Sequence, residues 1–299
     1  MGCKNAPRYG DFPRNIVYCN SSCQKLDWKN HKTACKKLQA RKILYRAADT
    51  IQRAWYVFRE HTFDNNIKKI EEDGKFLRLI DGPYDADIPK IGGHFFPFPN
   101  ALVKNERDKK AILTVTMCDD AVGYLHKFIK ELIEDVSVRI EEVQVSLRNK
   151  ERITYCIRDD GEEDNVDWDH HILRVTIKDG EAYAIDITGA QYNMFECIFP
   201  WDEYVGLHIS RIIRSRPFGS QKNQFTSWAI WNDLGGQICR IYADVVHIFD
   251  TEIAMWAKKA NLTLTRMHQL PEGEFRIKQG EMLDHVAKTL QRFTFQARY

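Results

Sequence analysis

Apolar side chains recur at steps of three and four residues in several stretches of this chain, which is the spacing of amphipathic helices. The clearest stretch predicts a helix that ends near His61, and its apolar face consists of Leu44, Ala48, Ile51, Trp55 and Phe58. The same spacing predicts three further helices, at residues 118–133, 237–259 and 283–293. Residues 201–213 are also expected to be helical, since they follow Pro200.

Two other stretches favour strands. Residues 140–147 alternate between apolar and polar side chains, as a half-buried strand does. Residues 172–187 predict a hairpin around Asp179-Gly180, because this pair favours a two-residue turn of type I′. Helices mixed with paired strands indicate an α+β fold, in which helices pack on an antiparallel sheet.

The length of the chain allows a small module in addition to a larger domain. At 299 residues and 43% hydrophobic composition, it can bury a sizeable core and still carry a small module. We expect a small N-terminal module at residues 1–36, a helical connector at 37–80 and an α+β domain at 81–299. Within that domain, residues 81–105 are rich in turn-forming Gly and Pro, and residues 159–169 hold seven acidic side chains that predict a solvated loop.

Charge is unevenly distributed along the chain. Residues 1–60 hold 13 Lys and Arg against 4 Asp and Glu, although the whole chain has a net charge of only +2. A basic front end is typical of nucleic-acid binding. The better interpretation is that these side chains solubilise the polar face of a helix, so we expect no nucleic-acid partner.

Cysteine usage and apolar run lengths bear on the compartment. Eight cysteines in a chain of this length do not make a disulfide framework. We find no signal peptide, and no apolar run approaches the roughly 18 residues of a membrane span. An intracellular location, in the nucleus or the cytoplasm, is therefore expected.

Four potential metal ligands lie close together near the start of the chain. Cys19, Cys23, His31 and Cys35 follow the spacing Cys-x3-Cys-x7-His-x3-Cys, and thiolates and imidazoles are ligands that zinc prefers. A short helix is expected at residues 24–35, so the last two ligands stand one turn apart on one face. The pattern predicts a Zn2+ site. The alternative is a Lys-rich surface helix with incidental thiols.

These residues resemble the second half of a MYND-type zinc finger. The family ends in Tyr-Cys-x3-Cys-Gln-x3-Trp-x2-His-Lys-x2-Cys, and every position of that pattern is present from Tyr18 to Cys35. The family binds two zinc ions through eight ligands, four of them from two upstream Cys-x2-Cys pairs. Here the upstream half holds only Cys3, which corresponds to the second cysteine of the first pair, while the second pair falls near Gly10 and Pro13. The resemblance implies a finger whose N-terminal half is degenerate or truncated.

The resemblance also implies ligand sets and a class of partner. In the family pattern, Cys3, Cys19 and Cys23 belong to one site, and His31 and Cys35 belong to the other. A rearranged single site of Cys19, Cys23, His31 and Cys35 is the alternative. MYND-type fingers bind proteins, often through Pro-containing peptides. The expected function is therefore zinc-dependent protein–protein interaction, fused to an α+β domain of unassigned role.

A second group of residues favours chemistry at a cysteine. If Asp179-Gly180 is a two-residue turn, His171 and Asp186 are diagonal neighbours on one face of the hairpin, and His170 points the other way. Cys118 begins a predicted helix that can pack on that face. A thiol at a helix start, beside an imidazole that a carboxylate orients, can act as a nucleophile. Cys118, His171 and Asp186 are the candidate catalytic residues.

Residues 118–191 are similar in order and spacing to the transglutaminase-like branch of the papain-like cysteine proteins. That family has a helix-start Cys, then a strand His, then an Asp that often precedes x-Thr, as in Asp186-Ile187-Thr188. The similarity implies a cysteine-dependent acyl transferase or hydrolase. Asp119 and Asp120 oppose thiolate formation, so an inactive domain with a buried cysteine and a structural His–Asp pair is the alternative. Some lysine methyltransferases also carry this finger. This chain lacks the Asn-His-Ser-Cys-like segment expected of them.

Overall fold

The computed structural model describes residues 6–7, 9, 20–83, 94–164 and 167–296, and these form the predicted α+β architecture. The helices are α1 (Ser21–His61), α2 (Glu106–Thr114), α3 (Cys118–Tyr124), α4 (His126–Ile133), α5 (Trp201–His208), α6 (Ser220–Trp228), α7 (Leu234–Ala260), α8 (Leu264–Met267) and α9 (Glu272–Gln296). The strands are β1 (Ile67–Glu72), β2 (Phe76–Asp81), β3 (Ser137–Leu147), β4 (Ile153–Ile157), β5 (His170–Ile177), β6 (Ala182–Ile185), β7 (Ile198–Pro200) and β8 (Ile209–Pro217). The described residues also include the 3-10 turns η2 (Asn100–Leu102) and η3 (Gly189–Tyr192).

The strands form two sheets. The larger sheet is antiparallel, with the order β7-β6-β5-β3-β8, and the smaller one has the order β1-β2-β4 with β2 and β4 parallel. The smaller sheet was not predicted, because β1 and β2 fall largely within the segment expected to be a helical connector. In β1 the two isoleucines are three residues apart among charged neighbours, a spacing that suits a helix as well as a strand.

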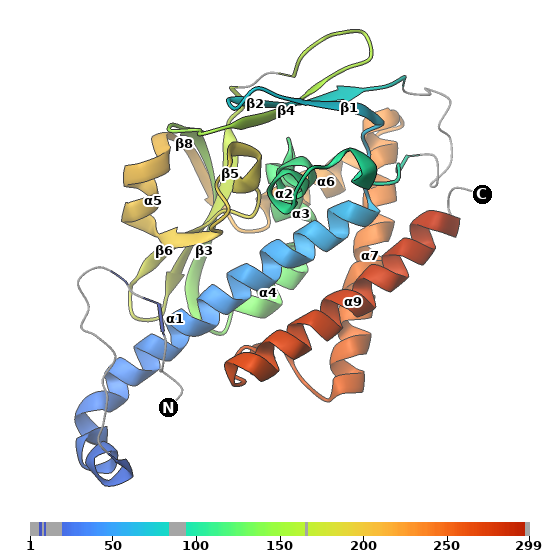
Figure 1. The fold of residues 1–299 in the computed structure, drawn as a ribbon. Coiled ribbons are helices and arrows are strands. Elements are labelled where there is room, and N and C mark those ends of the chain that lie inside the picture. Colours follow the sequence, from blue (N-terminus) through green and yellow to red (C-terminus); the bar gives the residue numbers. More distant parts are fainter. Residues whose placement is uncertain (1–5, 8, 10–19, 84–93, 165–166, 297–299) are drawn as a thin grey trace.

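Helix α1 crosses the middle of the molecule. Figure 1 shows it in blue, with the larger sheet on one side and α7 and α9 on the other. It ends at His61, where Thr62 N donates to the carbonyl oxygen of Phe58 over 3.0 Å. The predicted apolar face is confirmed, since all five of its side chains are fully buried in the largest core cluster: Leu44, Ala48, Ile51, Trp55 and Phe58.

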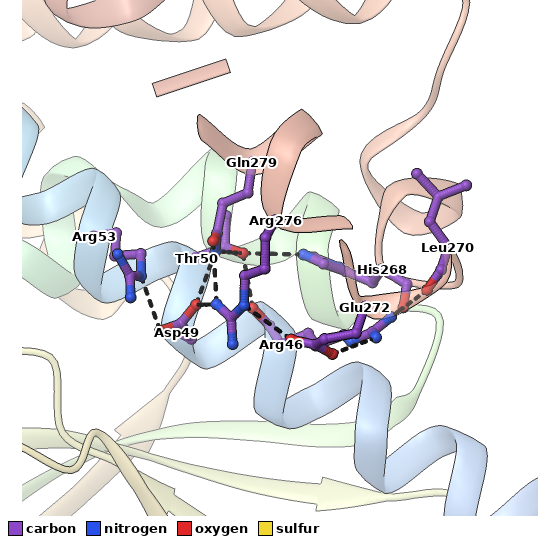
Figure 2. Close-up of polar contacts among 9 residues, drawn as sticks. All are labelled: Arg46, Asp49, Thr50, Arg53, His268, Leu270, Glu272, Arg276 and Gln279. Carbon is purple, nitrogen blue, oxygen red and sulfur yellow. Dashed lines mark hydrogen bonds and ion pairs between the residues drawn. The ribbon is translucent and has the colours of Figure 1, made fainter. Parts of the chain in front are cut away.

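A cluster of polar side chains connects α1 to α9 and to the segment before it (Figure 2). Arg46 donates to the carbonyl oxygens of His268 and Leu270, each over 2.7 Å. One turn later, the side-chain amide of Gln279 in α9 donates to Thr50 Oγ1 over 2.8 Å. Charge-assisted bonds to backbone carbonyls are stronger than neutral ones, so this cluster fixes the register between the helices. The remaining members are Asp49, Arg53, Glu272 and Arg276.

The β5–β6 hairpin differs from the predicted register by one residue. The backbone N–H of Ile177 donates to Glu181 over 2.9 Å, so the loop holds three residues, 178–180, rather than two. Gly180 takes the left-handed position at φ +89°, as the last residue of a three-residue hairpin loop commonly does. Leu173 consequently pairs with Ile185. A shift of one residue changes which side chains of β5 share a face with those of β6. The prediction that His171 shares a face with Asp186 is therefore wrong.

Two of the predicted helices also differ. The helix expected at 118–133 is divided at Leu125 into α3 and α4. The helix expected at 201–213 ends at His208, and the next residues form the edge strand β8. Residues 159–169 lie in a loop as predicted, apart from one bridge between Ile157 and Glu163 and two positions outside the described residues. None of the helices in the described ranges combines the length and apolar character needed to cross a bilayer.

Candidate functional site

A cavity of about 330 Å³ lies beside the first residues of α3. Its walls come from the start of α3, the strand β4, the turn η3 and the acidic loop before β5, four segments that are far apart in the sequence. The side chains that line it are Thr116, Cys118, Asp119, Asp120, Ile153, Thr154, Tyr155, Asp164, Trp168, Asp169, Gln191 and Tyr192.

A buried histidine and a buried aspartate meet behind this cavity. The Nε2 atom of His170 lies 2.8 Å from Asp186 Oδ1, and both side chains are at most 1% exposed. Asp186 also accepts from the Tyr204 hydroxyl (2.7 Å) and from the backbone N–H of Thr188 (3.1 Å). Gly189 packs so tightly against this carboxylate that a Cβ there would lie 2.5 Å from Oδ2. The carboxylate therefore has a fixed position from which it orients the imidazole.

His170 and Asp186 each stabilise the charged form of the other. Burial would lower the pKa of His170, but the charge and hydrogen bond of Asp186 raise it to about 10. Burial would raise the pKa of Asp186, but His170 holds it below its ordinary value. At neutral pH the two groups form an imidazolium–carboxylate pair in which Nε2 donates to the carboxylate.

Cys118 interacts with the same imidazole. Nε2 of His170 is committed to Asp186, and Nδ1 is buried without a hydrogen-bond partner among the described residues, so it is the ring nitrogen available to the thiol. Burial would raise the pKa of the Cys118 thiol, but the nearby imidazoles of His170 and His171 lower it below its ordinary value. Asp119 acts in the opposite sense, with Oδ1 at 3.9 Å from the sulfur. The net effect favours the thiolate, which is the nucleophilic form of cysteine.

His171 has a different carboxylate partner from the predicted one. Its Nδ1 atom forms an ion pair with Asp119, and the expected hydrogen bond to Asp186 is replaced by the bond from His170. Burial would lower the pKa of His171, but the contact with Asp119 raises it to about 9. His171 still lies beside the thiol, since its ring nitrogen, Asp119 and the sulfur of Cys118 are all within 4.8 Å of one another. The catalytic roles of these residues stay predictions.

Sequence reasoning missed His170 and part of the cavity wall. The error in His170 comes from the hairpin loop, because Asp179-Gly180 suits both a two-residue turn and the last two positions of a three-residue loop. Tyr192 lines the cavity and meets the His170 ring edge-on with centroids 5.3 Å apart. Thr154 had no sequence signal, since it is one residue of a short buried strand.

The described part of the predicted metal site lies in the first turns of α1. This helix begins where the Asn20 side chain accepts from the N–H groups of Ser22 and Cys23, each over 2.9 Å. His31 and Cys35 stand one turn apart and are each 3% exposed, as predicted for side chains on one face. Cys3 and Cys19 lie outside the described residues.

The side chains of the described ligands are of the kind that zinc prefers, but Cys23 lies eight residues before His31 on one continuous helix, and the three do not form a three-ligand cluster in the structure. Cys23 and Cys35 supply thiols and His31 supplies an imidazole, and such soft and borderline donors select zinc over harder cations. Burial of two of these donors on one face is what a small metal-bound module requires.

Residues 11–35 match the family model of the MYND finger. This confirms that the chain carries a MYND finger, which suggests zinc binding and protein–protein interaction for this part of the chain, while the degenerate N-terminal half stays a prediction. The match begins downstream of Cys3, so the assignment of Cys3 stays a prediction. No curated protein and no solved structure matches the chain. The family match does not extend to residues 118–191, so their similarity to transglutaminase-like proteins stays a prediction.

Proposed function

We propose that the α+β domain carries out cysteine-dependent acyl transfer, with Cys118 as nucleophile, His170 as acid and base, and Asp186 as the group that orients His170. The observation that carries this proposal is the buried 2.8 Å contact between His170 Nε2 and Asp186, which leaves Nδ1 without a hydrogen-bond partner among the described residues and available to the thiol. A nucleophile, a base and an orienting carboxylate next to a cavity are the parts that such catalysis requires.

The reaction follows from the protonation states. The Cys118 thiolate attacks an acyl carbon in the cavity and forms a C–S bond. His170 gives its Nδ1 proton to the leaving nitrogen or oxygen as that bond breaks, which produces a thioester on Cys118. Water or an amine then attacks the thioester while His170 accepts a proton from it. The C–S bond breaks, and the thiolate and imidazolium are restored.

This proposal predicts selective labelling of Cys118. Trace iodoacetamide at pH 7 should alkylate Cys118 at least about tenfold faster than Cys156 and Cys197, because burial raises the pKa of both of those thiols. The Cys118 rate should also reach its plateau with a midpoint below about 8.5, the usual thiol pKa. The measurement is peptide mass spectrometry over a series of pH values. Labelling of Cys118 at the rate of the buried thiols, or a midpoint above 8.5, would end the proposal.

We also propose a second function, recruitment of a protein partner by the MYND finger. The match at residues 11–35 favours it, as does the burial of His31 and Cys35 on one face. The partner we propose is a Pro-containing peptide segment, bound in the nucleus or the cytoplasm, and we keep the division at 1–36, 37–80 and 81–299. The finger would then bring the partner to an α+β domain that acts on it.

Metal analysis tests the finger. The purified chain should contain close to one zinc per molecule, and Cys35→Ser should remove most of it because one buried ligand is lost. Cys239→Ser is the matched control, since this buried cysteine lies in α7 outside the finger. Cys118→Ser is the second control. Freshly purified protein without zinc, or zinc that depends on Cys118 instead of Cys35, would contradict the assignment.

A further inference from the structure

We infer that the cavity beside Cys118 selects acyl substrates that carry a cation, such as a peptide with Lys or Arg next to the acyl group that reacts. This inference rests on the proposed acyl-transfer function and names its substrate class. Three observations carry it: the charge of the cavity wall, the incomplete pairing of its carboxylates, and an unsatisfied buried hydroxyl.

The described wall of the cavity is acidic. Four of its twelve side chains are carboxylates, and none of the described lining residues is Lys, Arg or His. The four are Asp119 and Asp120 from the start of α3, and Asp164 and Asp169 from the acidic loop. A cleft lined by one sign of charge concentrates ligands of the opposite sign.

The two loop carboxylates are poorly neutralised. Asp169 accepts from the Gln144 amide (3.0 Å) and the Ser146 hydroxyl (3.3 Å), and none of its partners in the described ranges is a cation. Asp164 forms one ion pair, at 3.9 Å, with a well-exposed Arg158. Both carboxylates therefore keep most of their charge available to a ligand.

The two carboxylates of α3 are held differently. Asp119 pairs with His171. Burial raises the pKa of Asp120 to about 7, although the charge of Arg59 acts against the shift. A cation that entered the cavity would relieve this cost, because it would stabilise the ionised carboxylate.

A hydroxyl group of the wall points to a ligand independently of these charges. Thr154 is 3% exposed, and its Oγ1 is buried without a hydrogen-bond partner among the described residues. An unpaired buried hydroxyl is costly, and an N–H of an ammonium or guanidinium group would satisfy it. Trp168, 58% exposed, adds an aromatic ring at the same wall, and cations are attracted to such faces.

Lys150, which lies close to the Tyr192 ring, is not part of this wall. Lys150 lies 5.2 Å from the ring centroid of Tyr192 and forms an ion pair with Asp167 over 3.7 Å. Neither Lys150 nor Asp167 lines the cavity. Lys150 therefore does not take the place that a substrate cation would occupy beside the acidic wall.

Charged thiol reagents test the inference without requiring turnover. The cationic probe is 2-(trimethylammonium)ethyl methanethiosulfonate, and the anionic probe is 2-sulfonatoethyl methanethiosulfonate. The rate of the cationic probe at Cys118 is divided by that of the anionic probe, and this ratio is then divided by the same ratio for 2-mercaptoethanol. The normalised ratio should be about 10 or more. It should fall toward one in 1 M salt, where charges more than about 3 Å apart are screened. Peptide mass spectrometry follows Cys118 separately from the other cysteines.

Substitutions in the wall provide the matched comparison. Asp169→Asn and Asp164→Asn each remove one charge and should lower the normalised ratio about threefold, and the double variant should lower it further. Asp284→Asn is the control, because Asp284 is exposed on α9 and does not line the cavity. A normalised ratio near one in the unmodified chain, or equal losses from Asp284→Asn, would overturn the inference.

Peptide amides connect the inference to catalysis. Matched peptides with Lys, norleucine or Glu beside a reacting glutamine amide are assayed for ammonia release by the full chain. Faster release from the Lys peptide supports the inference, and equal rates for all three overturn it while the proposed acyl transfer stands. If the charged probes show the cation preference but no peptide reacts in a Cys118-dependent way, the proposed function fails and the cation preference of the cavity stands alone.

Discussion

His170→Gln is expected to remove the selective reactivity of Cys118 and to destabilise the domain by about 3–5 kcal/mol, the usual cost of leaving one partner of a buried ion pair alone. The substitution leaves Asp186 at 1% exposure without its imidazolium. It also removes one of the two imidazoles that lower the pKa of the Cys118 thiol. Alkylation of Cys118 at pH 7 should slow by at least about tenfold, and urea denaturation should report the lost stability.

The stability change should depend on pH in a defined direction. The pKa of His170 is raised to about 10 in the folded state, so its stabilisation is complete below the unfolded value of about 6.5 and is lost as the pH rises toward 10. The pKa of Asp186 is lowered, so its stabilisation is present above about 4 and is lost as the pH falls further. The difference between the unmodified chain and His170→Gln should therefore be largest between about pH 4 and 6.5.

His171→Gln is the matched control for this experiment. It removes the neighbouring imidazole, which is paired with the half-exposed Asp119, but it keeps the bond between His170 and Asp186. Stability should change by about 1 kcal/mol or less, as for partly exposed pairs. Labelling of Cys118 should slow less than it does in His170→Gln. If His171→Gln has the larger effect on labelling, the base is His171, as the sequence predicted, and the assignment of His170 is wrong.

Arg59→Met should cost a comparable 3–5 kcal/mol, because it breaks an ion pair between the fully buried Arg59 and the largely buried Asp64. Arg59 is fully buried, donates to Asp64 over 2.8 Å and to the Thr62 carbonyl over 2.7 Å, and contacts the Tyr242 hydroxyl at 3.0 Å. These contacts join the end of α1 to the first residues after it and to α7. Without Arg59, the Asp64 carboxylate keeps only the Tyr242 hydroxyl as a bonded partner among the contacts described.

Thermal unfolding measures this prediction. For a domain of this size, each kcal/mol corresponds to roughly 2–4 °C, so Arg59→Met should lower the Tm by about 10 °C. Arg53→Met is the control on the same helix, since Arg53 is exposed and its ion pair among the described residues is an i,i+4 pair with Asp49 at 3.0 Å. That pair is worth about 0.5 kcal/mol or less. Similar shifts for the two variants would show that the buried pair carries no special share of the stability.

The helical part of the fold was predictable because its signal is local. The apolar face of α1 depends only on the spacing of residues within it, and burial in the core confirmed each position. The finger was equally accessible, because Cys23, His31 and Cys35 belong to a short continuous motif that a family model also matches.

The parts that sequence reasoning missed depend on distant partners. Strand β2 is parallel to β4, which lies more than 70 residues away, and no local pattern specifies that pairing. The choice between His170 and His171 depends on one residue of loop length at Gly180, because that residue decides which imidazole shares a face with Asp186. The polar wall of the cavity is assembled from four segments, so its charge becomes visible only in three dimensions.

Because α1 is continuous, its length sets the direction in which the finger faces around the helix axis. Its 41 residues run from the ligand-bearing turns to the core without a break, which gives a rod of about 60 Å. Each residue of an α-helix turns the chain by about 100°, so inserting one residue between Cys35 and Leu44 would swing the finger about a quarter-turn around the axis. Inserting about 18 residues, five full turns, would restore its direction and move it by about 27 Å. A partner bound by the proposed finger would therefore be held in a direction that the length of α1 sets, and an insertion or deletion in α1 would change that direction without altering the finger or the cavity.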